Sequence, residues 1–215
     1  MALELHAFDA VPELGACAAL VWRLDAPMLV ASTASVGGGI GPRRWVINAQ
    51  VDADYGRRDV EAHVAELAAE LGLPGGGVGM LTAADVTRVG VGHDGGVRVD
   101  ATVGLTLPVW AAAPVGSCDV APVGPGTINV VALVPVRHTD AALANLLCTV
   151  TEAKAQALFD LGVPGTGTAS DAVTVLCPGE GDAEPFGGPR SACGARVARA
   201  VYEAITSTAG AATAS

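Results

Sequence analysis

Hydrophobic positions along the chain fall into extended runs typical of strands and into spaced stripes typical of helices. Two extended runs come first, at 17–24 and 26–35, and the "RLDAP" between them has the composition of a turn. The stretch "SVGGGIGPRR" breaks the pattern, and "WVINAQV" at 45–51 resumes it. The segment 87–106 predicts a hairpin, because Asp94 and Gly95 tolerate the left-handed backbone of a tight turn.

Three segments have helical periodicity. The first, 60–71, follows Asp59 as a plausible N-cap; the second begins after Thr139 and continues to about Leu161; the third covers 191–205. The third should bury the apolar positions Val197, Val201, Ala204 and Ile205 and expose Arg196, Arg199 and Glu203.

The remaining segments complete the fold prediction. "GTINVVALVPV" is a near-continuous apolar run, which favours a central strand buried on both faces, and a strand is also expected at 171–177. Residues 107–126, rich in Pro, Gly and Ala, predict a long functional or covering loop. We therefore expect an α+β fold in a single domain, residues 1–208, with a mixed β-sheet and about three packed α-helices. The last residues, 209–215 within "TSTAGAATAS", are expected to form a disordered tail.

Composition and charge exclude several classes of protein. A formal net charge of −10 and a pI near 4.6 argue against partners rich in phosphate, so we expect no nucleic acid and no anionic membrane. We expect no secretory signal from the first residues given, and no apolar run reaches the ~20 residues that span a bilayer. Five widely spaced cysteines without a CxxC pair favour reduced thiols in the cytoplasm. Four scattered histidines give no metal-ligand spacing, so no metal site is predicted.

Lys154 is the most informative candidate residue, because it is the only lysine beside eleven arginines. At ~100° per residue it falls near the middle of the apolar stripe of its helix, whereas Glu152 falls on the opposite side. A buried ammonium needs an acidic partner, and Asp171 is the first candidate, with Asp100 second. The alternative is that the stem of Lys154 packs on the core while its head reaches water.

The stretch "GTGTASDAV" at 165–173 is the second candidate. Its glycines permit backbone shapes in which successive amides point at one oxygen, and its hydroxyls offer hydrogen bonds or nucleophiles. The alternative is a turn whose hydroxyls bond to their own backbone. Weaker candidates are the glycine-rich "STASVGGGIG" and the polar residues at the buried strands; together the candidate binding residues are Ser35, Gly37, Gly38, Gly39, Asn48, Thr127, Asn129, Thr166 and Gly167.

Common nucleotide and hydrolase motifs do not apply. "GVGHDG" satisfies GxGxxG, but a strand follows it rather than a helix. No GxxxxGK[ST] and no GxSxG occur. The residues alone therefore predict a small-molecule site built from hydroxyls, amides, one lysine and one carboxylate, without naming a reaction.

Several blocks taken together resemble a known family. "STASVGGG", "RRWVINAQV", "GVGMLTAADV", "VDATVGLT", "GTINVV", "TEAKAQAL", "GTASDAV" and "FGGPRSACGARVARAV" occur in an order and spacing that resemble the adenosylcobinamide amidohydrolase family over roughly residues 28–205. One departure is that Ala169 and Ser170 intervene between Thr168 and Asp171, where the family often reads GTGTD.

The resemblance implies an enzyme that hydrolyses the aminopropanol amide of adenosylcobinamide to adenosylcobyric acid and 1-aminopropan-2-ol, in the salvage or remodelling of B12-type cofactors. The substrate would be a corrinoid; no cofactor is expected, cobalt being part of the substrate, and a homo-oligomer stays open. Our own assignment of catalytic roles is that Asp171 or Glu152 activates water or a hydroxyl of Thr168 or Ser170, while Lys154 holds the acid or donates a proton.

Two alternatives use the same loops. A non-hydrolytic corrinoid-binding or handover protein needs no proton relay, so nothing would require an inward Lys154. A self-cleaving hydrolase would use a freed Thr127, Thr166 or Thr168 that follows a glycine.

Overall fold

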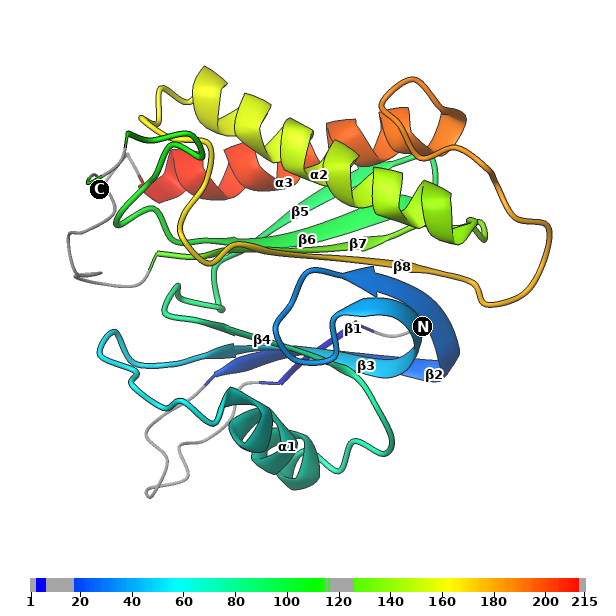
Figure 1. Cartoon of the computed structure of the whole chain (residues 1–215), viewed down its shortest axis with the longest axis horizontal. Helices are drawn as coiled ribbons and strands as arrows, with labels where there is room; N and C mark the ends of the chain where they lie inside the picture. The colour runs from blue at the N-terminus through cyan, green and yellow to red at the C-terminus, as the bar shows by residue number, and fades with distance from the viewer. Residues whose placement is uncertain (1–2, 7–17, 115, 117–125, 213–215) are drawn as a thin grey trace.

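The computed structural model describes residues 3–6, 18–114, 116 and 126–212, and these form one mixed sheet with helices on both outer sides (Figure 1). The elements are β1 Leu3–His6, β2 Ala19–Ser32, β3 Gly39–Gln50, α1 Val60–Glu70, β4 Val78–Thr82, β5 Val89–Asp94, β6 Val97–Val103, β7 Ile128–Leu133, α2 Asp140–Asp160, β8 Ala172–Cys177 and α3 Ala192–Ala212. The predicted α+β fold with a mixed sheet and three helices is confirmed.

The sheet has eight strands in the order β4-β3-β2-β8-β7-β6-β5, with β1 paired to β2. Strands β3 and β4 are parallel, as are β7 and β8, and each parallel pair is connected through a helix, α1 and α2 respectively. The other pairs are antiparallel. The sheet folds over on itself, so that the β2–β4 part lies across from the β5–β8 part (Figure 1).

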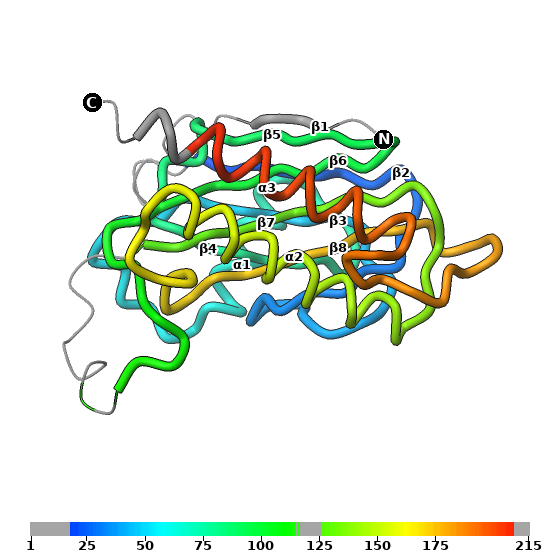
Figure 2. The backbone as a smooth tube through the Cα atoms, turned by 90° about the horizontal axis from the view of Figure 1, so that it is seen from above, coloured from blue at the N-terminus to red at the C-terminus, as the bar shows by residue number. Residues whose placement is uncertain are grey.

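The result is a four-layer arrangement of helices, sheet, sheet and helix. α2 and α3 lie side by side on the outer face of β5–β8 (Figure 2), and α1 covers the outer face of the other part. Three apolar clusters fill the three spaces between these layers, and the middle one draws Trp22 and Val46 from one part of the sheet and Val131 and Leu176 from the other. Burial of these apolar faces is the main force that holds the layers together.

Two glycines explain how closely α3 approaches the sheet. A Cβ atom at Gly90 or Gly92 on β5 would lie under 3.0 Å from the backbone oxygens of Ala204 and Ala200. The GxGxxG pattern at 90–95 therefore serves helix–sheet packing, and its last glycine, with Gly96, forms the turn of the hairpin at positive φ. The predicted hairpin is confirmed, with the turn one residue later than expected.

Three details differ from the sequence-based prediction. The two runs at 17–24 and 26–35 form one long strand, β2, whose "RLDAP" is a register shift between Arg23 and Met28 rather than a turn between strands. β3 begins at Gly39, so "GIGPRR" belongs to the strand. α3 continues to Ala212, which corrects the predicted disordered tail for residues 209–212; residues 213–215 lie outside the described residues.

Helices α1 and α2 begin where the sequence predicts, but only one of their two predicted N-caps forms a side-chain hydrogen bond. α2 begins where expected, and the hydroxyl oxygen of its N-cap Thr139 accepts a hydrogen bond from the Ala142 N–H at 3.2 Å. Asp59 precedes α1 but makes no capping hydrogen bond; its carboxylate pairs with Arg57 at 2.7 Å instead. The described part of the predicted loop 107–126 contains one isolated antiparallel β-bridge, between Val109 and Gly167. Residues 115 and 117–125 of this loop lie outside the described residues.

Candidate functional site

The amine of Lys154 points into the protein from α2 and forms an ion pair with the carboxylate of Asp171, just before β8. The two side chains are only 6% and 12% exposed, so both charges are held away from bulk water. The prediction of an inward lysine that meets Asp171 is confirmed. Glu152 lies on the exposed side of α2, a continuous helix that does not redirect it, so the structure does not bring Glu152 to this site.

Four donors surround the carboxylate of Asp171. One oxygen, Oδ1, accepts from the Ile128 N–H at 2.9 Å and from the Thr168 hydroxyl at 2.5 Å. The other, Oδ2, accepts from Lys154 and from the Thr168 N–H at 3.1 Å. The two residues between Thr168 and Asp171 form a turn. Although the GTGTD pattern lacks these two residues, the turn brings the Asp171 carboxylate back to Thr168. The charge of Asp171 is thereby fixed in place against the first residue of β7.

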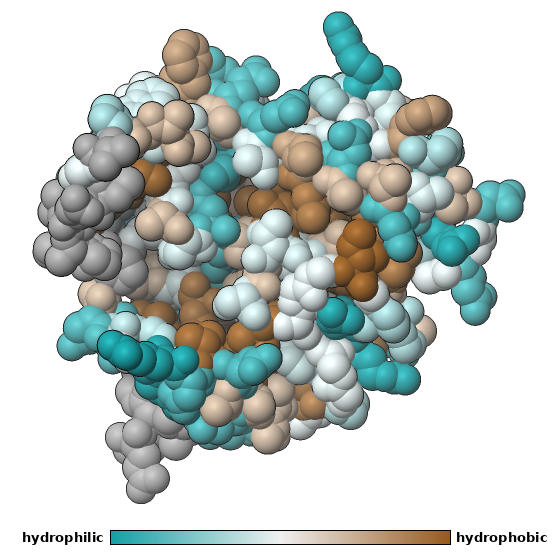
Figure 3. All heavy atoms as spheres, in the orientation of Figure 1, coloured by the Kyte–Doolittle hydropathy of each residue, from teal (hydrophilic) through white to brown (hydrophobic). Residues whose placement is uncertain are grey.

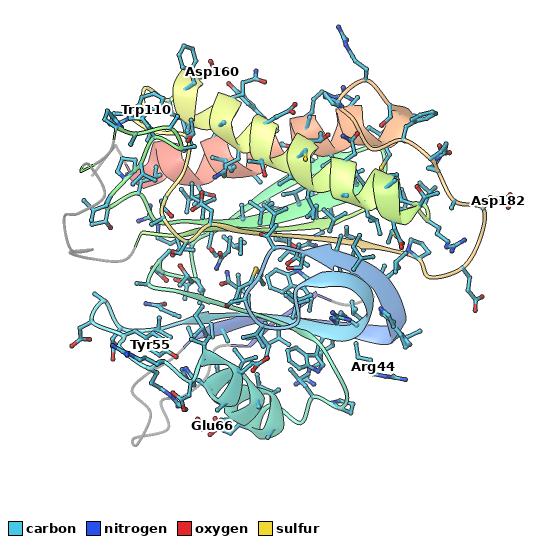
Figure 4. The ribbon with its side chains drawn as sticks, in the orientation of Figure 1. Arg44, Tyr55, Glu66, Trp110, Asp160 and Asp182 are labelled. Carbon is cyan, nitrogen blue, oxygen red and sulfur yellow. The ribbon has the colours of Figure 1, made fainter. Side chains whose placement is uncertain are left out.

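The glycine at 167 is required by this geometry. A Cβ atom there would lie under 3.0 Å from both Asp171 Oδ2 and Lys154 Nζ. The loop is held from its other side, because the Val109 N–H donates to the Gly167 carbonyl at 2.8 Å and the Thr166 N–H donates to the Val109 carbonyl at 2.9 Å. The Thr166 hydroxyl accepts from the Ala111 N–H at 3.0 Å, so it ties the two loops together rather than facing the cavity. In Figure 4, Trp110 of the 107–114 segment lies near the C-terminal end of α2.

A cavity of about 360 Å³ opens beside Asp171, between the two parts of the sheet. Its wall combines hydroxyl, amide and carboxylate groups with apolar ones. The lining residues are Thr33, Ala34, Ser35, Tyr55, Val60, Gly79, Met80, Leu81, Asn129, Ser170, Asp171 and Ala172. On the face drawn in Figure 3, strongly hydrophobic atoms gather in the central part, between α2 and α1.

Hydroxyls of neighbouring strand ends meet at the cavity. The Ser170 and Thr127 hydroxyl oxygens are 2.9 Å apart and share a hydrogen bond. Ser170 is exposed and lines the cavity, whereas Thr127 is 3% exposed and stands behind it. Of the two hydroxyls predicted to act in catalysis, Ser170 is therefore the one open to a ligand, whereas Thr168 is only partly exposed and does not line the cavity.

Asn48 and Asn129 meet across the space between the two parts of the sheet. The Asn129 side-chain N–H donates to Asn48 Oδ1 at 2.8 Å, and the Asn48 side-chain N–H donates to Thr102 Oγ1 at 2.9 Å. All three residues are 1–2% exposed. The expectation that these buried amides need polar partners is met by this chain of hydrogen bonds, which ends at the cavity through Asn129.

The glycine-rich loop at 37–39 does not reach the cavity. Gly37 and Gly38 form a turn whose carbonyls accept from the Arg43 guanidinium at 2.9 and 3.2 Å, and Gly39 begins β3. Among the residues predicted in this segment, Ser35 alone lines the cavity. The glycines are needed instead for close packing, because a Cβ at Gly37 would lie 1.9 Å from the Gly77 carbonyl oxygen.

The sequence interpretation missed Tyr55 and His63. Tyr55 lines the cavity wall formed beside α1 (Figure 4); its ring stacks on His63 with centroids 5.4 Å apart, and its hydroxyl lies 2.8 Å from His63 Nδ1. Burial lowers the pKa of His63 below 6.5 and raises the pKa of Tyr55 above 10.0. The lowered pKa favours the neutral ring of His63, whose Nδ1 can accept a hydrogen bond from the Tyr55 hydroxyl. No motif marks this pair, because its partners come from a loop and a helix eight residues apart.

Asp100, the second candidate partner of Lys154, belongs to a different cluster. Its carboxylate accepts from the Trp22 indole N–H at 3.0 Å and pairs with Arg98 at 2.9 Å. These three residues line a separate cavity of about 140 Å³ between the two parts of the sheet. Asp100 therefore joins the two parts and takes no part in the Lys154 site.

Within the residues that the structure describes, no three His, Cys, Asp or Glu side chains gather as metal ligands. In that same part of the chain, no helix combines the length and the apolar character of a membrane span.

The fold and site define a protein with a polar-lined small-molecule cavity, bordered by a buried lysine–aspartate pair and hydroxyls, at one end of a four-layer domain. The chain belongs to the adenosylcobinamide amidohydrolase family, whose model matches residues 7–215. It is similar to an adenosylcobinamide amidohydrolase of Halobacterium salinarum, with 38% identity over 132 residues that cover 59% of this chain and 55% of that protein. It is also similar to an adenosylcobinamide amidohydrolase of Methanosarcina mazei, with 27% identity over 184 residues, 81% of this chain and 87% of that protein. The match to the halobacterial relative thus spans little more than half of that protein's length.

Proposed function

We propose that this protein hydrolyses the amide that joins the corrin ring's propionate arm to aminopropanol in adenosylcobinamide. Water adds across the C–N bond, so the products are adenosylcobyric acid and 1-aminopropan-2-ol, and the reaction serves salvage or remodelling of B12-type cofactors. The observation that carries the proposal is the buried Lys154–Asp171 pair at the wall of the cavity, in a chain that belongs to this family. The cobalt belongs to the substrate.

The cavity offers the groups that amide hydrolysis needs. Asp171 lines the cavity and already accepts the Thr168 hydroxyl proton in a hydrogen bond, so it can take a proton from Thr168 or, after a local shift, from a bound water. Lys154 balances the charge of Asp171 and can return a proton to the departing amine. Of the two proposed nucleophilic hydroxyls, Thr168 and Ser170, Ser170 is the one that lines the cavity, where it can act as a nucleophile or a hydrogen-bond donor beside the scissile carbonyl.

The surroundings of the cavity suit an amide-rich corrinoid. Ser35, Thr33 and Asn129 provide hydroxyl and amide groups, and Met80 and Leu81 provide apolar contact. A volume of about 360 Å³ accommodates the propionate–aminopropanol arm rather than the whole corrin ring. We therefore propose that the arm enters the cavity while the ring stays at its mouth. The net charge of −10 argues against a nucleic-acid partner. We propose the cytoplasm as the protein's compartment.

The experiment is to incubate the purified protein with adenosylcobinamide and to measure free 1-aminopropan-2-ol and adenosylcobyric acid by mass spectrometry. Equal amounts of the two products, formed in proportion to enzyme and time, support the proposal. Tight binding of adenosylcobinamide without products would instead indicate a corrinoid-binding or handover protein. An intact mass equal to that of the full chain would exclude self-cleavage before Thr127, Thr166 or Thr168.

A further inference from the structure

One buried polar atom of a cavity-lining residue has no hydrogen-bond partner among the described residues. Asn129 is 2% exposed and lines the cavity, and its side-chain oxygen Oδ1 has no hydrogen-bond partner among the described residues. Buried acceptors are rarely left unpaired in folded proteins, because an unpaired acceptor has lost its water without compensation. The unpaired oxygen therefore indicates a ligand that brings a hydrogen-bond donor.

The direction in which this oxygen points is fixed from behind. The Asn129 amide N–H donates to Asn48 Oδ1 at 2.8 Å, so the oxygen is the arm of this cavity-lining amide that is left without a partner among the described residues. With Asn48 in its observed orientation, turning the Asn129 amide over would place two carbonyl oxygens against each other. Asn48 is held in turn, because its own side-chain N–H donates to Thr102 Oγ1 at 2.9 Å.

The backbone explains why these three side chains meet. Thr102 on β6 lies directly opposite Asn129 on β7, so both side chains leave the same face of the sheet. Asn48 comes from β3, on the other part of the folded sheet, and fits between them. The hydroxyl of Thr102 thus anchors the side chain of Asn48, and Asn48 anchors that of Asn129.

We propose that Thr102 is a positioning residue which acts through Asn48 to hold Asn129 Oδ1 ready to accept a hydrogen bond from an amide N–H of the corrinoid substrate. The identity of that substrate rests on the proposed function. A carbonyl oxygen also discriminates: an amide N–H of the ligand satisfies it, whereas a carboxylate would oppose it with another lone pair. Asn129 is therefore the residue that favours an amide-bearing substrate over a carboxylate-bearing one.

The test compares Thr102→Val with Thr102→Ser in steady-state hydrolysis of adenosylcobinamide. Valine keeps the shape of threonine but removes the oxygen that accepts from Asn48, so the Asn129 amide is no longer held. We expect KM to rise about tenfold, the size of one lost hydrogen bond, while kcat changes by less than about threefold. Thr102→Ser keeps the hydroxyl and should restore KM. Thr174→Val is the matched control, because Thr174 is also a buried threonine of the sheet. Its hydroxyl lies 2.8 Å from Ser32 Oγ and takes no part in the hydrogen bonds that join Thr102, Asn48 and Asn129. The KM of Thr174→Val should therefore stay near that of the wild type.

A double substitution separates positioning from a general structural effect. Asn129→Leu should raise KM by more than Thr102→Val, and adding Thr102→Val to Asn129→Leu should cause no further rise, because Thr102 acts only through Asn129. If Thr102→Val does not fold, Thr102→Ala provides the same loss of the hydroxyl with less bulk.

The proposal is overturned if Thr102→Val binds and turns over substrate like Thr174→Val, if Thr102→Ser fails to restore KM, or if the Thr102 effect persists in the Asn129→Leu background. The proposed function fails separately, if the wild-type protein releases no aminopropanol. In that case equilibrium dialysis of adenosylcobinamide with the same variants decides the positioning role. A Kd about tenfold weaker for Thr102→Val supports it, and an unchanged Kd contradicts it.

Discussion

Replacing Asp171 by asparagine should separate the structural from the chemical role of the buried ion pair. The substitution preserves size but leaves the Lys154 ammonium, whose side chain is 6% exposed, without a counter-charge. It also turns one acceptor oxygen of residue 171 into a donor that faces hydrogen-bond donors. Breaking a buried pair by removing one partner costs about 3–5 kcal/mol of stability, and losing a proton-accepting carboxylate costs ~10²–10⁴ in rate.

The neutral double variant makes this prediction discriminating. Lys154→Met combined with Asp171→Asn removes both charges, and replacing a whole buried pair by neutral groups is often close to neutral for stability. The double variant should therefore regain most of the free energy of unfolding that Asp171→Asn loses, while its hydrolysis of adenosylcobinamide stays as slow. Lys154→Met alone should destabilise less than Asp171→Asn, because three donors still meet the carboxylate.

The assay is urea unfolding followed by tryptophan fluorescence, with aminopropanol release measured on the same samples. Asp182→Asn is the matched control, since Asp182 is exposed and lies away from the site in Figure 4, so both readouts should match the wild type. The reasoning is refuted if Asp171→Asn unfolds with the wild-type free energy, or if the double variant is less stable than either single one.

Three further predictions rest on other residues. Gly167→Ala should abolish hydrolysis and lower the thermal unfolding midpoint, because the added methyl group would collide with the Lys154–Asp171 pair. Gly76 has open space around it, so Gly76→Ala should change neither the activity nor the midpoint. Equal losses in the two variants would contradict the prediction. Burial lowers the pKa of His63, so the unfolded chain binds more protons than the folded protein as the pH falls below about 6.5, and the folded protein loses stability there. The His63→Phe variant should not show this loss when its free energy of unfolding in urea is compared at pH ~5.5 and pH ~7.5. A loss equal to that of the wild type would disprove the prediction. Cys148 is exposed and should react with iodoacetamide in the folded protein. Burial raises the pKa of Cys193 to about 11 and should protect its thiol until urea unfolds the chain. Peptide mass spectrometry would show the order of labelling, and labelling of Cys193 in the folded protein would contradict the described core.

The helical part of the site could be predicted from the sequence because it depends on local periodicity. A period of 3.6 residues places Lys154 on the buried face of α2 and Glu152 on the exposed face, and the structure shows both. A single inward lysine requires an acid, and Asp171 is the nearest one along the chain at the start of a buried strand. The ion pair therefore follows from two elements adjacent in sequence.

The strand part could not be predicted to the same extent because it depends on how the sheet folds over. Asn48 and Asn129 each signalled a need for a polar partner, but their contact arises only once β3 lies across from β7. The polar residues near Arg23 resembled a turn, yet they mark the irregularity of one long strand that takes part in both halves. Glycines of 37–39 likewise suggested a ligand loop, whereas close backbone packing accounts for them.

The most direct test is a crystal structure of the Asp171→Asn variant with adenosylcobinamide bound. The account predicts that the aminopropanol amide lies in the cavity beside residues 170 and 171, with an amide N–H of the corrinoid donating to Asn129 Oδ1. An aminopropanol arm bound outside this cavity, with Asn129 Oδ1 still unpaired, would contradict it.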